Sequence, residues 1–158
     1  MVKLNYMRLC LNTNVFCRPF DDLSQERILK EAMAANKIFI WAQAGLVEIL
    51  ASEANLTEIF LIKNMYKKDA VESLVLAASA NAIKLENSTI ELADTIWEEN
   101  IMSDYMDILH LSMASASNCE YFLTCDDEII KKKKHLEKFT KCIILNPVDF
   151  VSLMEVKF

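Results

Sequence analysis

Glycine and proline are nearly absent from this chain, which has one glycine and two prolines among its 158 residues. Tight hairpin turns need glycine or Asn-Gly pairs, so a β-sandwich built from hairpins is disfavoured. A general basic surface is also lacking, because the formal net charge is -6. Any contact with nucleic acid must therefore use a local basic patch or a bound cation.

Long hydrophobic runs and clustered metal-ligand motifs are missing as well. No apolar run reaches the length of a membrane span, and the first residues, MVKLNYMRLCLNTN, lack the apolar core of a signal peptide. The five cysteines form no CxxC pair, and neither histidine lies near a cysteine cluster. These features disfavour a zinc site and a disulfide framework. We expect a cytoplasmic protein, without a membrane contact, whose reduced thiols pack as small hydrophobic groups.

What remains is the composition of an ordinary globular domain. Hydrophobic residues make up 53% of the chain and charged residues 25%, enough for a sizeable core and a solvated surface. The length suits one domain. Since no repeat, low-complexity tract or linker interrupts the sequence, we predict a single domain over residues 1–158.

Short apolar segments alternate with longer segments of helical pattern along the chain. Strands are predicted at four places: residues 8–11, 37–42 (KIFIWA), 121–124 and 142–145. Helices are predicted over residues 22–36, 45–54, 57–66, 69–81, 88–99 and 104–117, and again from 126 and from 146. This order predicts an α/β fold, a three-layer doubly wound parallel sheet flanked by helices on both faces.

Polar residues follow two of the predicted strands directly. Asn12-Thr13-Asn14 comes after the first strand, and Thr124-Cys125-Asp126-Asp127 comes after the YFLT strand. Ligands of doubly wound sheets bind beyond the carboxyl ends of the strands. The sequence therefore predicts a binding site where these two segments meet.

Three acidic residues stand among apolar neighbours. Asp126 follows a buried strand, Glu48 lies in GLVEIL, and Asp107 lies in YMDIL. A carboxylate on a largely buried segment is costly unless it is paired or bound to a cation. Each alone is most simply the start of a helix or an exposed edge residue. Together, and with Asn12, they indicate a shared cation site.

Four segments also resemble, in order, the PIN family of metal-dependent ribonucleases. They are Leu9 to Phe20 (LCLNTNVFCRPF), Asp107 to Leu111 (DILHL), Phe122 to Asp126 (FLTCD) and Ile143 to Phe150 (IILNPVDF). The resemblance implies a nuclease with four acidic residues around Mg²⁺ or Mn²⁺ that cleaves RNA. It also implies a toxin of the VapC type, with an antitoxin protein as partner, and a homodimer.

Carried over position by position, the resemblance assigns the metal site to one amide and three acids. The fourth acid of the family matches Asp126 and the third matches Asp107. The second is best matched by Glu48, expected on the helix after the second strand, with Glu53 as the alternative. The first acid is replaced by Asn12.

The amide of Asn12 changes what the site is expected to do. An amide oxygen can coordinate a hard cation but adds no negative charge. A tenfold loss of affinity or rate needs only about 1.4 kcal/mol. We therefore expect weaker metal binding and reduced hydrolysis with the fold intact, whether Asn12 is a natural or an introduced residue.

Other polar residues are candidates for supporting roles. Asn14 and Thr124 could orient the ligands, and Asp104 could lie at the rim of the site. A run of basic residues that could contact phosphates follows Asp126: Lys131, Lys132, Lys133 and Lys134. The simpler explanation is a solvated helix end, where cations oppose the helix dipole. Lys63, Lys67 and Lys68 form a second candidate patch.

Three hypotheses about function follow. In the first, the chain is an Mg²⁺- or Mn²⁺-dependent ribonuclease that needs no nucleophilic side chain. In the second, Asn12 has disabled the nuclease, and the fold binds RNA or a protein partner. In the third, the chain is a doubly wound receiver-like domain, in which clustered Asp residues bind Mg²⁺ for phosphorylation.

Overall fold

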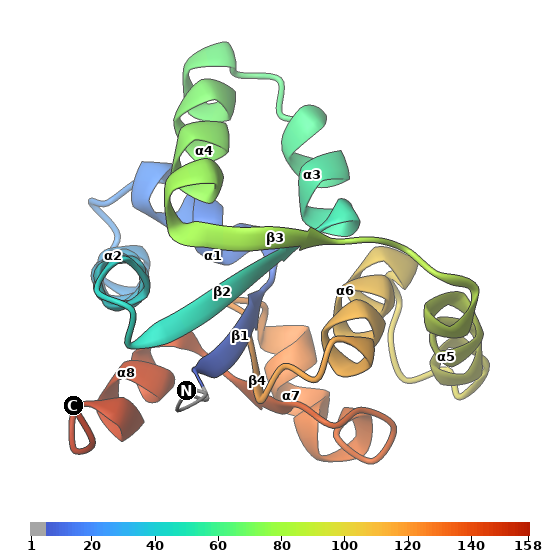
Figure 1. Cartoon of the computed structure of the whole chain (residues 1–158). Coiled ribbons are helices and arrows are strands. Elements are labelled where there is room, and N and C mark those ends of the chain that lie inside the picture. Colours follow the sequence, from blue (N-terminus) through green and yellow to red (C-terminus); the bar gives the residue numbers. More distant parts are fainter. Residues whose placement is uncertain (1–5) are drawn as a thin grey trace, which may run out of the picture.

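The structure, a computed structural model that describes residues 6–158, is built around a parallel sheet with strand order β3-β2-β1-β4-β5 (Figure 1). Its strands are β1 (Met7–Leu11), β2 (Val47–Ser52), β3 (Ser79–Ile83), β4 (Tyr121–Leu123) and β5 (Ile143–Leu145). From β1, the strands β2 and β3 are added on one side of the sheet, and β4 and β5 are added on the other side. The order in which strands are added therefore reverses between β1 and β4, although all strands run parallel. Receiver-like domains have the order 2-1-3-4-5. The receiver-like hypothesis is therefore wrong.

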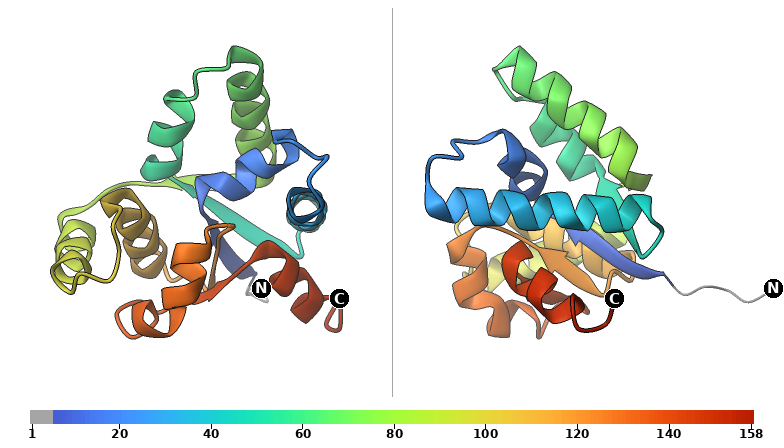
Figure 2. Two further views of the ribbon diagram at one scale, coloured as in Figure 1. Left: turned by 180° about the vertical axis from the view of Figure 1, so that it is seen from behind. Right: turned by 90° about the vertical axis from the view of Figure 1, so that its left-hand side faces the viewer.

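Helices cover both faces of this sheet (Figures 1 and 2). One face carries α1 (Thr13–Cys17), α2 (Glu26–Gln43), α3 (Glu53–Phe60), α4 (Met65–Ala78) and α8 (Pro147–Met154), and the short η1 (Arg18–Phe20) follows α1. The other face carries α5 (Asn87–Glu98), α6 (Tyr105–Ala116) and α7 (Asp127–Leu136). Leu9 and Leu11 enter one buried cluster and Cys10 the other, because alternate strand residues face opposite sides. The predicted three-layer doubly wound fold is confirmed.

The predicted strand over residues 37–42 is wrong, because this segment is the second half of α2. Ala35, Ile38 and Phe39 are buried at helical spacing, whereas Ile40 is 62% exposed. A short apolar run does not distinguish a strand from the buried face of a helix. Here the run continues a helical pattern that begins at Glu26.

The predicted helix over residues 45–54 is also wrong. Gly45, at φ +75°, ends α2 in the left-handed region, where its N–H bonds to the carbonyl of Ala42 and that of Leu46 to the carbonyl of Trp41. The chain then enters β2. The predicted helix over residues 57–66 corresponds to α3, which begins and ends earlier, and to the start of α4. The strand β3 was not predicted, since the helix expected to reach Asn81 ends at Ala78.

The remaining elements lie close to their predicted positions. The strands expected over residues 8–11, 121–124 and 142–145 are β1, β4 and β5. The helices expected over 88–99 and 104–117 are α5 and α6. The helices expected from 126 and from 146 are α7 and α8, which begin after the caps Asp126 and Asn146.

The expectation that every cysteine is reduced is wrong for one pair. Cys10 on β1 and Cys119, just before β4, form a disulfide in the second core cluster. The thiols of Cys125 and Cys142 are free and buried, and burial raises the pKa of each to about 12. These two residues behave as the packed, unreactive thiols that the sequence predicted.

Two further expectations concern the ends and the surface of the chain. The prediction that no signal peptide is present rests partly on residues 1–5, which lie outside the described residues. Within residues 6–158, every helix is too short or too polar to cross a membrane.

Candidate active site

The two polar segments that follow β1 and β4 meet where the direction of the sheet reverses. The N–H of Asn12 bonds to the carbonyl of Leu123 at 2.8 Å, and its amide Nδ2 donates to Oγ1 of Thr124 at 3.0 Å. Both side chains are buried, at 4% and 0% exposure. A reversal of strand order opens a crevice at the carboxyl edge of a sheet. The expected meeting of these segments is therefore present.

Asn14 and Thr124 fix the segment that carries Asp126. Oγ1 of Thr124 accepts the N–H of Asp126 at 3.0 Å, and Oδ1 of Asn14 accepts the N–H of Cys125 at 3.0 Å. Asp126 then caps α7 by accepting the N–H of Glu128 at 2.8 Å. This cap uses one oxygen of Asp126 and places the carboxylate at the positive end of α7.

Asp107 lies in the first turn of α6, after the helix cap Asp104, which accepts the N–H of Met106 at 2.8 Å. The pKa of Asp107 is raised to about 6, chiefly by burial and also by the charges of Asp104 and Asp126. His110 opposes this rise and Glu58 adds to it. Asp107 therefore lies in a partly desolvated cluster of like charges, the setting in which a cation would be favoured.

Glu58, on α3, is the acidic residue of this cluster that the sequence analysis did not find. Its carboxylate accepts a hydrogen bond from Oγ1 of Thr13 at 2.8 Å and pairs with Nε2 of His110. Burial alone would raise the pKa of Glu58, but the bond and charge of His110 and the bond from Thr13 lower it overall. Glu58 is thus held as a carboxylate between α1 and α6.

A buried polar contact sets the position of α3 against β1. Ser52 and Asn55 form a capping box at the start of α3. Nδ2 of Asn55 also donates to the carbonyl of Leu11 and to Oγ1 of Thr13, both at 3.0 Å. Leu11 and Thr13, the residues on either side of Asn12, are thereby hydrogen-bonded to α3, the helix that carries Glu58.

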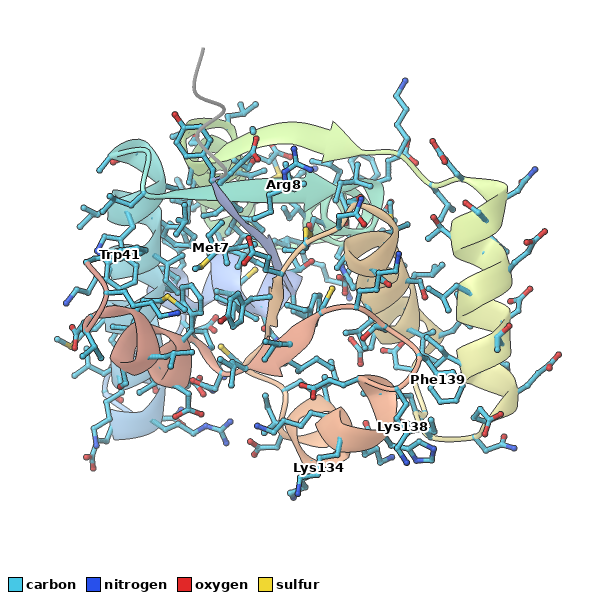
Figure 3. The ribbon with its side chains drawn as sticks, turned by 60° about the horizontal axis from the view of Figure 1, so that its bottom comes forward. Met7, Arg8, Trp41, Lys134, Lys138 and Phe139 are labelled. Carbon is cyan, nitrogen blue, oxygen red and sulfur yellow. A yellow bond between two sulfur atoms is a disulfide. The ribbon has the colours of Figure 1, made fainter. Side chains whose placement is uncertain are left out.

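The structure does not bring Glu48 to the cluster. Glu48 is on β2, opposite Arg8 on β1, and its Oε2 lies 3.0 Å from Nε of Arg8. Arg8 lies toward the beginning of β1 (Figure 3), and four residues of strand separate Glu48 from the end of β2, about 13 Å. The assignment of Glu48 rested on a helix that is a strand. Glu53, the alternative, accepts the N–H of Leu85 at 2.6 Å instead.

No protein-family model and no curated protein matches the sequence of this chain. The structure matches a chain in the crystal structure of VapBC2 from Rickettsia felis bound to a DNA fragment from their promoter, with TM-score 0.59, 16% identity and coverage of 89% of this chain and 98% of the other. It also matches FitAcB from Neisseria gonorrhoeae, with TM-score 0.58, 15% identity and coverage of 88% and 97%.

The fold is PIN-like. Identities of 15–16% show the shared fold alone.

The donor chemistry of the PIN-like site suits a hard divalent cation. Asp107 and Asp126 offer carboxylate oxygens. In Asn12, Nδ2 donates to Thr124, so Oδ1 is the atom that could coordinate an ion. Among the described residues, however, no three His, Cys, Asp or Glu side chains are already arranged around one ion. The side chain of Asn12 is neutral, and the carboxylate of Glu58 already bonds to Thr13 and His110. The residues fit such an ion in kind, with less charge than four acids would supply.

The basic residues of α7 lie along its second half. Lys131 and Lys134 are exposed, whereas Lys132 pairs with Glu128 at 3.1 Å and donates to the carbonyl of Ile101. Figure 3 shows Lys134 and Lys138 pointing outward at this end of the helix. The helix begins at Asp126, so these side chains form a basic surface on an element that starts in the site.

Proposed function

We propose that this chain is a PIN-type ribonuclease module that uses Mg²⁺ or Mn²⁺ and whose hydrolysis is weakened or abolished by Asn12. The observation that supports it best is the convergence of Asn12, Glu58, Asp107 and Asp126, from four elements, on the point where the sheet reverses. The proposal differs from the sequence-based assignment in one residue, Glu58 in place of Glu48.

The proposed roles follow from the contacts of each residue. Asp107, Asp126 and Oδ1 of Asn12 would hold the ion, and Glu58 would complete the site. A bound divalent ion supplies a more acidic water and neutralises charge on a phosphodiester. Thr124 and Asn14 keep Asp126 and Asn12 in register through their hydrogen bonds. Thr13 and His110 orient the carboxylate of Glu58.

We further propose that RNA is the substrate and that the exposed lysines of α7 contact its phosphates. A protein partner, an antitoxin or a second copy of the chain, is supported by an open apolar groove of about 550 Å³ between α3 and α6. Its walls include Leu56, Phe60, Met106 and Leu109. A homodimer and an antitoxin complex are both tested by light scattering, alone and with a candidate partner.

The rival function is a disabled PIN-like module that binds RNA or protein without cleaving. It is favoured by the neutral Asn12 and by the engagement of Glu58 with His110. Both leave less free negative charge for an ion than four unpaired acids would.

One assay separates these functions. Mn²⁺-dependent cleavage of single-stranded RNA is measured for the chain and for Asn12→Asp. Restoring the charge should raise the rate at least about tenfold, because a tenfold change needs only ~1.4 kcal/mol. Cleavage by Asn12→Asp alone identifies an inactivated nuclease, and cleavage by both identifies an active one. If neither protein cleaves RNA but the chain still binds it, the chain is a binding module and not a nuclease.

A matched pair of second substitutions tests the site assignment. In the Asn12→Asp background, Glu58→Gln should abolish most of the cleavage, because it removes charge from the site. Glu48→Gln should leave cleavage within about twofold, because Glu48 pairs with Arg8 on the surface. The reverse result would restore Glu48 as the second acid.

A further inference from the structure

Large hydrophobic side chains are exposed where α3 turns into α4, a segment that we call the α3–α4 tip (residues 60–68). Phe60 is 71% exposed, Leu61 67%, Met65 63% and Tyr66 90%. Figure 1 shows α3 and α4 projecting from the sheet, with their connection far from it. Exposed apolar residues are common singly, but such a concentration marks a binding surface.

The tip is basic although the chain is acidic. Residues 60–68 contain three lysines, Lys63, Lys67 and Lys68, and no acidic residue, whereas the whole chain has a net charge of -6. Lys63 is exposed and forms no ion pair within the described residues. Nζ of Lys68 lies 4.4 Å from the ring centroid of Phe60, so a cation and an aromatic ring are adjacent. Lys68 also lies 4.0 Å from Oε1 of Glu72, and Lys67 pairs with Asp21, so Lys63 is the lysine of the tip that has no acidic partner among the described residues.

The tip is connected to the candidate active site. Nζ of Lys67 lies 2.7 Å from Oδ1 of Asp21, which follows η1. Phe60 lies on α3, two residues after Glu58. The tip is therefore joined to the candidate active site through α3 and through the pair of Lys67 with Asp21.

We infer that the α3–α4 tip binds an unpaired nucleic-acid strand, with Tyr66 and Phe60 stacking on bases and the exposed Lys63 contacting a phosphate. Under the proposed function, on which this inference rests, the strand is the RNA that enters the site. Aromatic rings beside cations are the arrangement that binds single strands without reading sequence. An exposed lysine beside these rings favours a polyanion such as a nucleic acid. An uncharged apolar surface would instead suit an apolar helix of a protein partner.

The test measures binding in EDTA, so that it does not depend on cleavage. The probe is a short fluorescein-labelled oligouridylate, and its Kd is read by fluorescence anisotropy. Tyr66→Ala should weaken binding about tenfold, a factor that corresponds to ~1.4 kcal/mol, as expected for losing one stacked base. Tyr66→Trp should retain binding. Lys63→Gln should reduce the slope of log Kd against log salt by about 0.7, the value for one phosphate contact on a single strand.

Leu76→Ala is the matched control, because Leu76 is 84% exposed on the same helix but outside the tip. It should leave Kd unchanged. Equal Kd values for Tyr66→Ala and Leu76→Ala would overturn the inference, and so would a change only in self-association by light scattering, which would make the tip a protein contact. Tighter binding of the matching oligodeoxythymidylate would overturn the assignment to RNA.

The two proposals fail separately. If Asn12→Asp does not cleave but Tyr66→Ala weakens binding, the nuclease proposal fails and the tip remains a nucleic-acid surface. If Asn12→Asp cleaves and Tyr66→Ala binds like the unchanged chain, only the inference about the tip fails.

Discussion

Two polar clusters of this molecule differ in whether their buried carboxylates are matched by positive charges and hydrogen-bond donors. Glu31 on α2 is 2% exposed and is matched on all sides. Its Oε2 lies 2.6 Å from Nε of Arg18, and its Oε1 lies 3.1 Å from Nε of Arg27 and 2.9 Å from Nδ2 of Asn146. Burial would raise the pKa of Glu31, but these partners lower it overall.

The candidate active site has the opposite balance. Asp104 and Asp126 lie close enough to Asp107 to raise its pKa, and His110, whose charge opposes that rise, is paired with Glu58. The Glu31 cluster is complete within the chain, so it stabilises the fold. The Asp107 cluster leaves like charges unmatched, and under the proposed function a divalent ion would match them. The difference teaches that the unmatched cluster, and not the most buried acid, indicates function.

The largest effect is expected from removing the charge of Glu31. Glu31→Gln removes the buried carboxylate that Arg18 and Arg27 share. It leaves each arginine with one partner that is more exposed than Glu31, namely Asp21 and Asp127. The free energy of unfolding should therefore fall by about 2–3 kcal/mol, since the arginines remain partly exposed. Urea denaturation measures this change. Asp127→Asn, which removes the exposed partner of the same Arg27, should change the free energy of unfolding far less, because the pair is exposed to solvent. Equal losses would show that the Glu31 cluster is no better matched than a surface pair.

A smaller effect, of opposite sign, is expected at Asp107. Its pKa is raised from 3.8 to about 6, so the folded chain binds this proton more tightly than the unfolded chain. Asp107 therefore contributes stability below about pH 4 and loses it as the pH rises through about 6. The loss is at most about 3 kcal/mol, reduced to ~1–2 by partial exposure.

The substitution Asp107→Asn should remove this pH dependence. Near pH 7.5 the variant should be more stable than the native chain by about 1–2 kcal/mol, and near pH 4 the two should be alike. Urea denaturation at both pH values is the measurement. A variant that is less stable at the higher pH would mean that Asp107 has a partner that compensates its charge.

The smallest effect is expected from Asn12→Asp in the absence of metal. The new carboxylate adds a like charge near Asp107 and replaces the donor to Thr124 by an acceptor, so stability should fall by about 1 kcal/mol. Mn²⁺ at a hundred times its Kd should return about 2.7 kcal/mol. Thermal melting with and without Mn²⁺ measures both, and Asn36→Asp, at an exposed position of α2, is the control. Stabilisation of both variants by Mn²⁺ would mean that the ion binds elsewhere.

The parts of the fold that could be predicted are those in which local and tertiary preferences agree. The strands before Asn12 and Asp126 are short apolar runs that end in polar caps, and α6 follows the capping residue Asp104. The prediction for KIFIWA was wrong because its buried residues continue a helical face that includes Ala35, the tenth residue of α2, and the short apolar segment taken alone does not show that pattern. Gly45 was the available signal, since a lone glycine after an apolar stretch ends a helix.

The residues of the candidate active site divide in the same way into those that the sequence predicted and those that it did not. Asn12, Thr124 and Asp126 could be placed because parallel strands end at one edge, and Asp107 because its helix was recognised. Glu58 was missed because β2 was taken as a helix, so the helix after the second strand was sought in the wrong segment. Its pairing with His110 joins residues 52 positions apart, which no local pattern reveals.

The bond between Cys10 and Cys119 turns most of the chain into a covalent ring, with a sequence separation of 109. Asn12, Glu58 and Asp107 belong to the ring, whereas Asp126 lies on the tail that leaves it. A protease that cuts a surface loop of the ring, such as the one that follows Phe60, would open it without releasing a fragment. The nicked protein would run at full mass until a reductant separates its two pieces.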